Sequence, residues 1–301
     1  MTATSAPAVS GAGTPSRLQP LRRFASGFAR RPGGVAGLAV LIVMTALALT
    51  APLFIHPSDL DVVSASGPSL APPSLGYPLG TDQPGRSVLL LVIWGARPSM
   101  AIGVIATACT IAIGAVIGLL AGHFGGIVGR GLMALTDWFI ALPALPLAIA
   151  LAAVLGQGDA SITIAIAVTS WPSTARIVRA QTLAVEARPF VERAHALGAG
   201  HFQVMLRQVL PNVAPIILVS STLTVAGSIL SETTLQFLGL GNPTDVSWGT
   251  MINQAVLQGA VTRGAWWYLL PPGIAILIVV LGFTLTGRAI ENVLNPRMGT
   301  R

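Results

Sequence analysis

The sequence has no lysine, a single cysteine and very few charged residues. Only 9% of its 301 residues are charged, whereas a soluble domain usually has about a quarter. So few charges cannot cover a surface with polar groups, which excludes an ordinary soluble domain and favours one membrane-embedded unit. The lone Cys109 excludes a disulfide framework and a cysteine metal site.

The absence of lysine also excludes a Walker A loop, whose lysine contacts the nucleotide phosphates. The sequence has no His-Glu-x-x-His, no Gly-x-Ser-x-Gly and no paired carboxylates that would line a cleft. It therefore predicts a chain that is not an enzyme and that holds no metal or cofactor of its own. The formal charge of +7 does not indicate nucleic-acid binding, because the arginines are spread along the chain and flank apolar runs.

Long apolar runs make up much of the sequence, and 53% of its residues are hydrophobic. A helix of about 20 apolar residues spans the hydrocarbon layer of a membrane. Residues 35–55 form the first such run, and a retained span is favoured over a signal peptide, whose apolar core is shorter and nearer the N-terminus. Five further spans are predicted at 98–122, 131–156, 160–175, 213–238 and 266–287. The predicted class is an all-α integral membrane protein with six transmembrane helices.

These spans divide the chain into five parts. The parts are a partly disordered cytoplasmic tail (1–32), a first transmembrane helix (33–56), an extracytoplasmic loop (57–97), a core of five transmembrane helices (98–290) and a cytoplasmic C-terminal tail (291–301). The apolar residues 88–94 are either an interfacial helix or the first turns of the second span. The fourth span is the weakest, and Trp171-Pro172 interrupts it.

The arginines set the predicted orientation. With the N-terminus in the cytoplasm and six spans, fourteen arginines lie inside and three outside. Cytoplasmic loops of membrane proteins carry such an excess, and the opposite orientation would invert it. The prediction is an N-in, C-in topology that places the polar residues 186–211 in the cytoplasm.

The pattern of residues 186–211 predicts two short helices. Pro189 suits the first position of a helix, and apolar residues follow it at helical spacing. Gly198 is a natural stop, and a second helix is predicted to end at Leu210-Pro211. Such a pair either lies at the lipid interface or docks a cytoplasmic partner.

The segment resembles the EAA loop of ABC importer permeases. That motif runs Glu-Ala-Ala, three residues, Gly, nine residues, Ile, any residue and Leu-Pro, and the stretch from Glu192 to Pro211 has the same spacing. Arg193 replaces the middle Ala, and Gln208 replaces the Ile. The resemblance implies a coupling loop that docks into a cleft of an ATP-binding subunit. The loop residues it implicates are Phe190, Glu192, Ala194, Leu197, Gly198, Phe202, Leu210 and Pro211.

Other stretches are similar to the C-type permease subunit of dipeptide, oligopeptide and nickel importers. "PLGTDQPGRSVL" at 78–89 resembles a signature of that subunit, with Ser87 where Asp is usual. "GARPSM", "AGHFGG", "SWPSTARIVRAQ" and "ETTLQFLGLG" also resemble it. The resemblance implies the type I ABC importer permease fold and a short-peptide substrate. Nickel, glutathione-like molecules and haem are alternative substrates, and a secondary transporter is the rival class.

The resemblance further implies the partners. They are a homologous B-type permease, one or two ATP-binding subunits that hold ATP and Mg²⁺, an extracytoplasmic substrate-binding protein and the lipid bilayer. The implied location is a bacterial inner membrane.

Four residues are candidates for the translocation path or a gate: Asp137, Trp171, Pro172 and Glu232. Ionisable residues are costly in lipid and should face protein or water. A structural hydrogen bond or a contact with a partner subunit is the alternative for the two acids. The histidines at 123, 195 and 201 are not expected to form a ligand set, because they are distant in sequence or on different helices.

We predict that the isolated chain neither binds nor hydrolyses ATP, since it has no lysine for a Walker A loop. Equilibrium binding of labelled ATP to the purified chain checks this. Tight stoichiometric binding would contradict it.

Overall fold

The computed structural model describes residues 19–294. The predicted disordered tail (1–16) and the end of the C-terminal tail lie outside these residues. The described part is helical, and its β-structure is limited to an isolated bridge between Thr81 and Ser87. The predicted all-α class is confirmed.

Four helical stretches within the described residues are long and apolar enough to cross a membrane. They are α2 (Pro32–Phe54), α4 (Val88–His123), the continuous run of α9 (His201–Val204), η1 (Met205–Val209) and α10 (Leu210–Phe237), and α12 (Trp266–Leu294). A bent pair of helices makes a fifth if it is counted as one span. A further helix, α7 (Asp159–Glu186), has 28 residues but does not reach the same hydropathy. The six-span count therefore stays a prediction.

The bent pair consists of α5 (Gly126–Ala141) and α6 (Ala144–Leu155), which meet at 90°. The residues expected as one span over 131–156 therefore form two helices rather than one continuous helix. Pro143 caps the start of α6, and the residue before a proline is driven out of helical geometry. The turn at 142–143 consequently redirects the chain.

Residues 88–94 form the first turns of α4, which begins at Val88 and runs through Pro98, so the second of the two alternatives for this stretch is confirmed. The expected interruption at Trp171-Pro172 is absent. The helix α7 runs through Trp171-Pro172, both of which are buried. A proline removes one backbone hydrogen bond, and neighbouring helices in a membrane bundle compensate for that loss.

Four shorter helices complete the described chain: α1 (Gln19–Ala29), α3 (Pro57–Leu60), α8 (Pro189–Ala196) and α11 (Trp248–Leu257). The sequence reading missed α1, which it placed in the tail, and α11. A capping box between Ser247 and Thr250 starts α11, and this signal could have revealed that helix.

Glycines set the closest helix packing, which is that of α4 against α7. Gly114, Gly118 and Gly122 recur every four residues and face α7. A Cβ added at Gly118 would lie 2.6 Å from the carbonyl oxygen of Ala175. Small residues at this spacing let two membrane helices approach at backbone distance. The pair α4 and α7 therefore forms the centre of the bundle.

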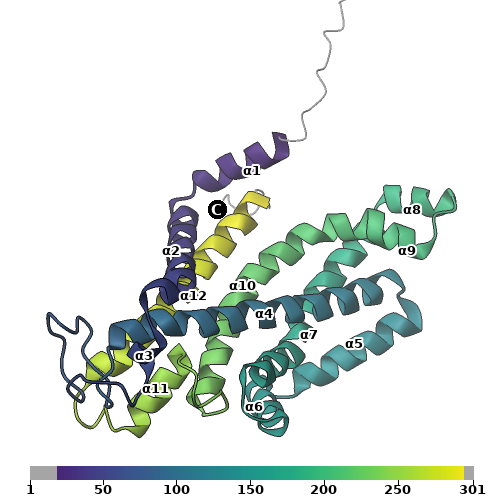
Figure 1. Ribbon diagram of the computed structural model, residues 1–301. Helices are drawn as coiled ribbons and strands as arrows, with labels where there is room; N and C mark the ends of the chain where they lie inside the picture. Colours follow the sequence, from purple (N-terminus) through teal and green to yellow (C-terminus); the bar gives the residue numbers. More distant parts are fainter. Residues whose placement is uncertain (1–18, 295–301) are drawn as a thin grey trace, which may run out of the picture.

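The two ends of the bundle differ in character. Figure 1 shows α1, the end of α12 and the pair α8–α9 toward the upper side, while α3 and α11 lie at the lower left with the 55–87 loop. The helix α2 lies beside α12, where Gly37 approaches the backbone of Gly282. Both ends of the described chain thus lie on the same side as the candidate coupling loop.

We predict that Gly118→Ala lowers the free energy of unfolding by about 1–3 kcal/mol, because the added methyl group meets a backbone carbonyl that cannot turn away. Thermal unfolding of the isolated chain in detergent measures this. The matched control is Gly227→Ala on α10, where an added Cβ has no neighbour within 4 Å. Equal melting temperatures of the two variants would contradict the packing account.

Candidate functional site

The helix α8, the first of the two predicted coupling helices, ends in a Schellman turn at Gly198. The amide of Ala199 donates to the carbonyl of Ala194, and the amide of Gly198 donates to the carbonyl of His195. Gly198 has φ +85°, a left-handed conformation that glycine adopts without the penalty of a Cβ. No atom lies within 4 Å of a Cβ added there, so the backbone conformation alone requires the glycine.

The second coupling helix does not end at Leu210-Pro211, as the sequence analysis expected. It continues from α9 through the π-helical turn η1 into α10. The amide of Leu210 donates to the carbonyl of Met205, and Pro211 lies in the first turn of α10, where its missing amide hydrogen costs little. A single helical path therefore leads from the loop into the membrane.

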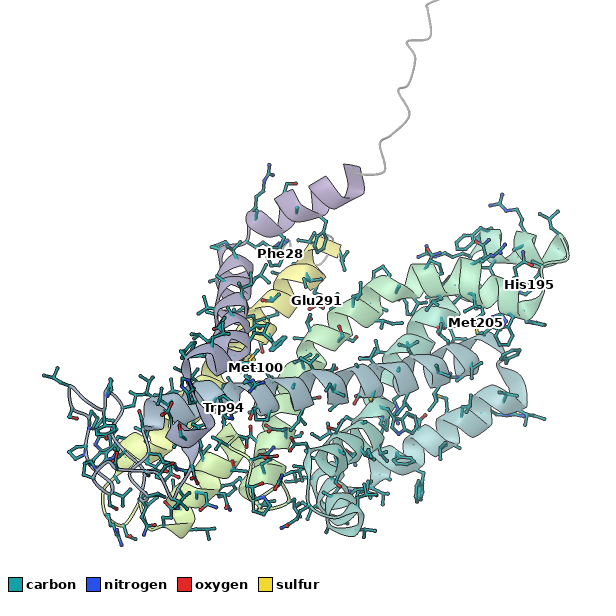
Figure 2. All side chains as sticks on the ribbon, in the orientation of Figure 1. Phe28, Trp94, Met100, His195, Met205 and Glu291 are labelled. Atoms are coloured by element: carbon teal, nitrogen blue, oxygen red, sulfur yellow. The ribbon has the colours of Figure 1, made fainter. Side chains whose placement is uncertain are left out.

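One face of the loop is fixed to the bundle by apolar packing. Val191, Val204, Met205 and Val209 are buried in a cluster with Val185 and other residues of α4, α7 and α10. Figure 2 shows Met205 on the side of the loop that faces the bundle. Burying each such side chain contributes roughly 1.5–3 kcal/mol, so the loop is a rigid part of the fold.

The other face of the loop leaves large apolar side chains uncovered. Leu197 is 87% exposed and Phe202 is 66% exposed, and Leu206 is also exposed. Clustered exposed apolar side chains at one point of a protein mark an interaction site. Both side chains are therefore open to a partner, and their part in docking stays a prediction.

The remaining residues of the predicted coupling set divide between the two faces. Phe190, Ala194 and Leu210 pack partly against the internal cluster, so Phe190 offers less contact surface than the sequence suggested. Glu192 is exposed in the first turn of α8, where the helix dipole stabilises a carboxylate. Pro211 is exposed at the start of α10.

Three histidines meet beneath this loop. The rings of His123, His195 and His201 lie 5.3–6.2 Å apart, centroid to centroid. Their distance in sequence was therefore a poor guide to their distance in space. Within residues 19–294 no group of three His, Cys, Asp or Glu residues is arranged to hold a metal ion.

Asp137 on α5 pairs with Arg176 on α7. The carboxylate oxygen lies 2.6 Å from the guanidinium nitrogen, and both side chains are more than half exposed. Ion pairs at membrane depth face water or protein rather than lipid. The pair therefore marks a face of the chain that is suited to a water-filled path or to a second permease.

Trp171 and Pro172 lie in the interior of α7. Trp171 packs edge-on against Phe139 of α5, with ring centroids 5.2 Å apart. This contact joins α7 to α5, the helix that ends just before the turn at residues 142–143. A gating role for these two residues stays a prediction.

Glu232 lies in the interior of the chain rather than on an open face. It is fully buried on α10 and accepts hydrogen bonds from Ser99 of α4 and from Thr233. The hydroxyl of Ser99 also accepts a hydrogen bond from the backbone amide of Trp248 in α11, with 3.2 Å between the oxygen and the nitrogen. Glu232 thus joins three elements, which favours the structural alternative over direct contact with a substrate.

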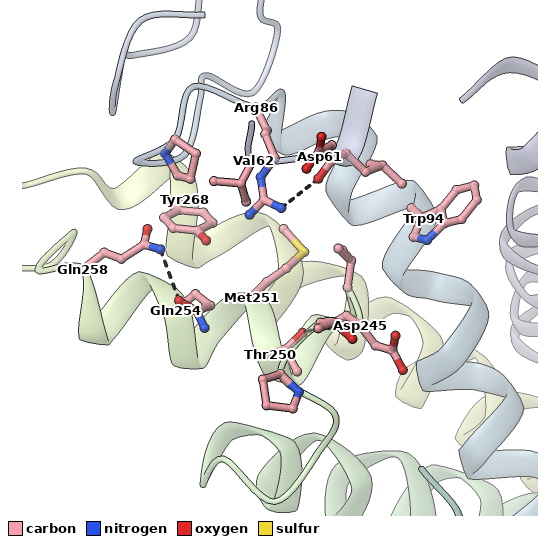
Figure 3. Close-up of a pocket in the computed structure, with 15 residues that line it drawn as sticks. Asp61, Val62, Arg86, Trp94, Asp245, Thr250, Met251, Gln254, Gln258 and Tyr268 are labelled. Atoms are coloured by element: carbon pink, nitrogen blue, oxygen red, sulfur yellow. Dashed lines mark hydrogen bonds between the residues drawn. The ribbon is translucent and has the colours of Figure 1, made fainter. Parts of the chain in front are cut away.

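A pocket of about 590 Å³ opens between the 55–87 loop and α11. Figure 3 shows Arg86, Tyr268, Met251 and Asp245 lining it. Arg86 is anchored by a 2.7 Å ion pair with the fully buried Asp82 and donates to the carbonyl of Leu60. These bonds join two parts of the loop to each other, so they fix the position of Arg86 in the wall of the pocket.

Comparison with known proteins identifies the relatives of this chain. Residues 114–300 match the model of the binding-protein-dependent transport system inner membrane component. Residues 19–73 match the N-terminal transmembrane domain of oligopeptide transport permease C.

Individual relatives align over most of their lengths. The di/tripeptide transport system permease protein DppC of Pseudomonas aeruginosa is 36% identical, over 93% of this chain and 93% of its own. The oligopeptide transport system permease protein OppC of Lactococcus lactis is 33% identical, over 83% and 85%. The glutathione transport system permease protein GsiD of Pectobacterium atrosepticum is 32% identical, over 93% and 92%.

We predict that Glu232→Ala lowers the free energy of unfolding by about 1–3 kcal/mol, because the Ser99 hydroxyl loses its buried acceptor. Glu232→Gln keeps an oxygen in place and should stay close to the wild type. Thermal unfolding in detergent compares the two variants. An unchanged melting temperature for Glu232→Ala would show that the network contributes nothing.

Proposed function

The chain belongs to the family of binding-protein-dependent transport system inner membrane components, and on that premise we propose that it is the C-type permease subunit of an ATP-driven ABC importer of short peptides. The match to the N-terminal domain of permease C supports the C-type assignment. Relatives named as di/tripeptide and oligopeptide permeases support the peptide substrate. The chain forms half of the translocation pore, and a homologous B-type permease forms the other half.

The exposed apolar tip of the coupling loop is the observation that carries this proposal. Leu197 and Phe202 project from helices whose opposite face is packed into the bundle. The motif spacing and the arginine bias place this tip in the cytoplasm, where one or two ATP-binding subunits dock on it. ATP and Mg²⁺ bind to those subunits and not to this chain.

Transmission of movement follows from the geometry of the loop. ATP binding draws the two ATPase subunits together, and each coupling loop moves with its subunit. Because α9, η1 and α10 form one continuous helical path, displacement at Phe202 reaches the membrane-embedded part of α10 without an intervening hinge loop. Buried hydrogen bonds join Glu232 of α10 to Ser99 of α4, and Ser99 to Trp248 of α11. Through these contacts the displacement of α10 reaches the extracytoplasmic end.

The remaining features fit a pore half in a bacterial inner membrane with six spans, N-in and C-in. The exposed pair of Asp137 and Arg176 faces the path or the B-type partner. With this topology, the pocket at Arg86 and Tyr268 faces the extracytoplasmic side, where the binding protein delivers its peptide.

We predict that Gly198→Val abolishes peptide uptake and reduces ATPase retention by at least about tenfold. A β-branched residue cannot hold φ +85° without strain, so α8 tilts and withdraws Leu197 from the docking cleft. Losing about 1.4 kcal/mol of docking energy already weakens binding tenfold. Co-purification of the ATPase subunits with the permease pair measures retention, alongside uptake of labelled peptide.

The matched control is Gly200→Val, two residues away in the same loop. Gly200 has φ −69° and ψ 155°, a conformation that valine adopts readily, and no atom lies within 4 Å of an added Cβ. Normal retention and uptake in Gly198→Val would show that the loop does not couple the permease to an ATPase.

A further inference from the structure

Three of the four histidines of the chain meet at the base of the coupling loop. His123 is the last residue of α4, Glu186 is the last residue of α7, His195 lies on α8, and His201 begins α9. Four helices therefore contribute to one cluster, and α4 is separated from the other three by α5 and α6. We refer to these four side chains as the histidine joint.

A chain of hydrogen bonds runs through the joint. His123 Nδ1 lies 2.5 Å from a carboxylate oxygen of Glu186, and His123 Nε2 lies 3.2 Å from His201 Nδ1. The ring of His195 lies 5.4 Å from that of His201, centroid to centroid. The His123 side chain is only 1% exposed, whereas His195 and His201 are exposed to solvent.

The donors and acceptors of this chain limit its charge. A carboxylate only accepts hydrogen bonds, so His123 Nδ1 carries a hydrogen. The bond between His123 Nε2 and His201 Nδ1 needs a hydrogen on one of these nitrogens and a lone pair on the other. It forms when both rings are neutral or when one is an imidazolium. If both rings are imidazolium ions, two N–H groups face each other and the bond is lost.

The surrounding charges do not relieve that repulsion. Glu186 supplies the carboxylate that contacts a ring, and a single negative charge balances a single imidazolium. The charged side chains nearest in sequence on the adjoining elements are Arg130 on α5, Arg179 on α7, Arg188 just before α8, Glu192 and Arg193 on α8 and Arg207 on η1. Among the described residues none of these six bonds to a ring of the joint.

We propose that His123, Glu186 and His201 are positioning residues that lock the coupling loop onto the ends of α4 and α7, and that the lock opens in acid. The proposal rests on the coupling function proposed above. The open joint binds more protons than the closed one, so falling pH favours the open form and rising pH favours the closed form. Histidine is the side chain whose charge commonly changes between about pH 5 and 8, so this is the range to test.

The experiment uses the complete transporter, with its partner permease, ATPases and binding protein, reconstituted in vesicles. Peptide taken up per ATP hydrolysed is measured from pH 8 to pH 5.5, with the pH changed on the ATPase side. The ratio for the wild type should fall about tenfold across this range, as expected for one controlling proton. His123→Ala should show a low ratio throughout.

Conservative variants separate a proton-linked lock from simple structural support. The amide of His201→Asn can donate to His123 Nε2 but does not titrate, so this variant should stay coupled and lose most of the acid response. Glu186→Gln keeps an acceptor but removes the balancing charge, so its loss of coupling should begin at higher pH. The control is His56→Asn, an exposed histidine near Asp59 in the extracytoplasmic loop, which should follow the wild type.

The outcomes distinguish this inference from the proposed function. If Gly198→Val abolishes uptake while His201→Asn and Glu186→Gln follow the wild-type pH profile, the loop couples and the proton-linked joint is wrong. If Gly198→Val transports normally, the coupling function itself is wrong. A wild-type profile that changes when a chelator is added would assign the cluster to a metal ion and overturn the joint.

Discussion

The close approach of α4 and α7 is the interaction on which the other features depend. Gly114, Gly118 and Gly122 bring the two backbones together, so the end of α4 lies beside the end of α7. Those ends carry His123 and Glu186, and the apolar cluster that seats the coupling loop lies beside them. A wider spacing between α4 and α7 would separate both the cluster and the hydrogen-bond chain.

The coupling loop combines a fixed face with an uncovered one, and this division accounts for its role. Val191, Val204 and Val209 hold the loop rigidly on the bundle, while Leu197 and Phe202 remain available to a partner. The unbroken helical path into α10 then gives a displacement of the tip a direct route to the membrane.

The sequence predicted the parts of this structure that depend on composition and short-range spacing. Apolar runs located most of the long helices, and the glycine at 198 predicted the end of α8, because both signals are local. Proline was a source of error. Trp171-Pro172 was expected to interrupt the fourth span but lies inside a continuous helix, since tertiary packing decides whether a membrane helix tolerates a lost backbone bond. The same reason left open whether residues 88–94 belong to the second span, of which they form the first turns. The histidine joint and the Glu232 network could not be predicted, because they unite residues more than 60 positions apart whose meeting depends on helix packing.

The central claim is that the exposed tip of the coupling loop docks into an ATP-binding subunit. The most direct test places a photo-crosslinking amino acid at position 197 in membranes that contain the complete transporter. The account predicts a covalent product between this chain and an ATPase subunit, formed in high yield at this position and lost when the ATPases are stripped from the membrane. Crosslinks to lipid alone, with the ATPases present, would contradict it.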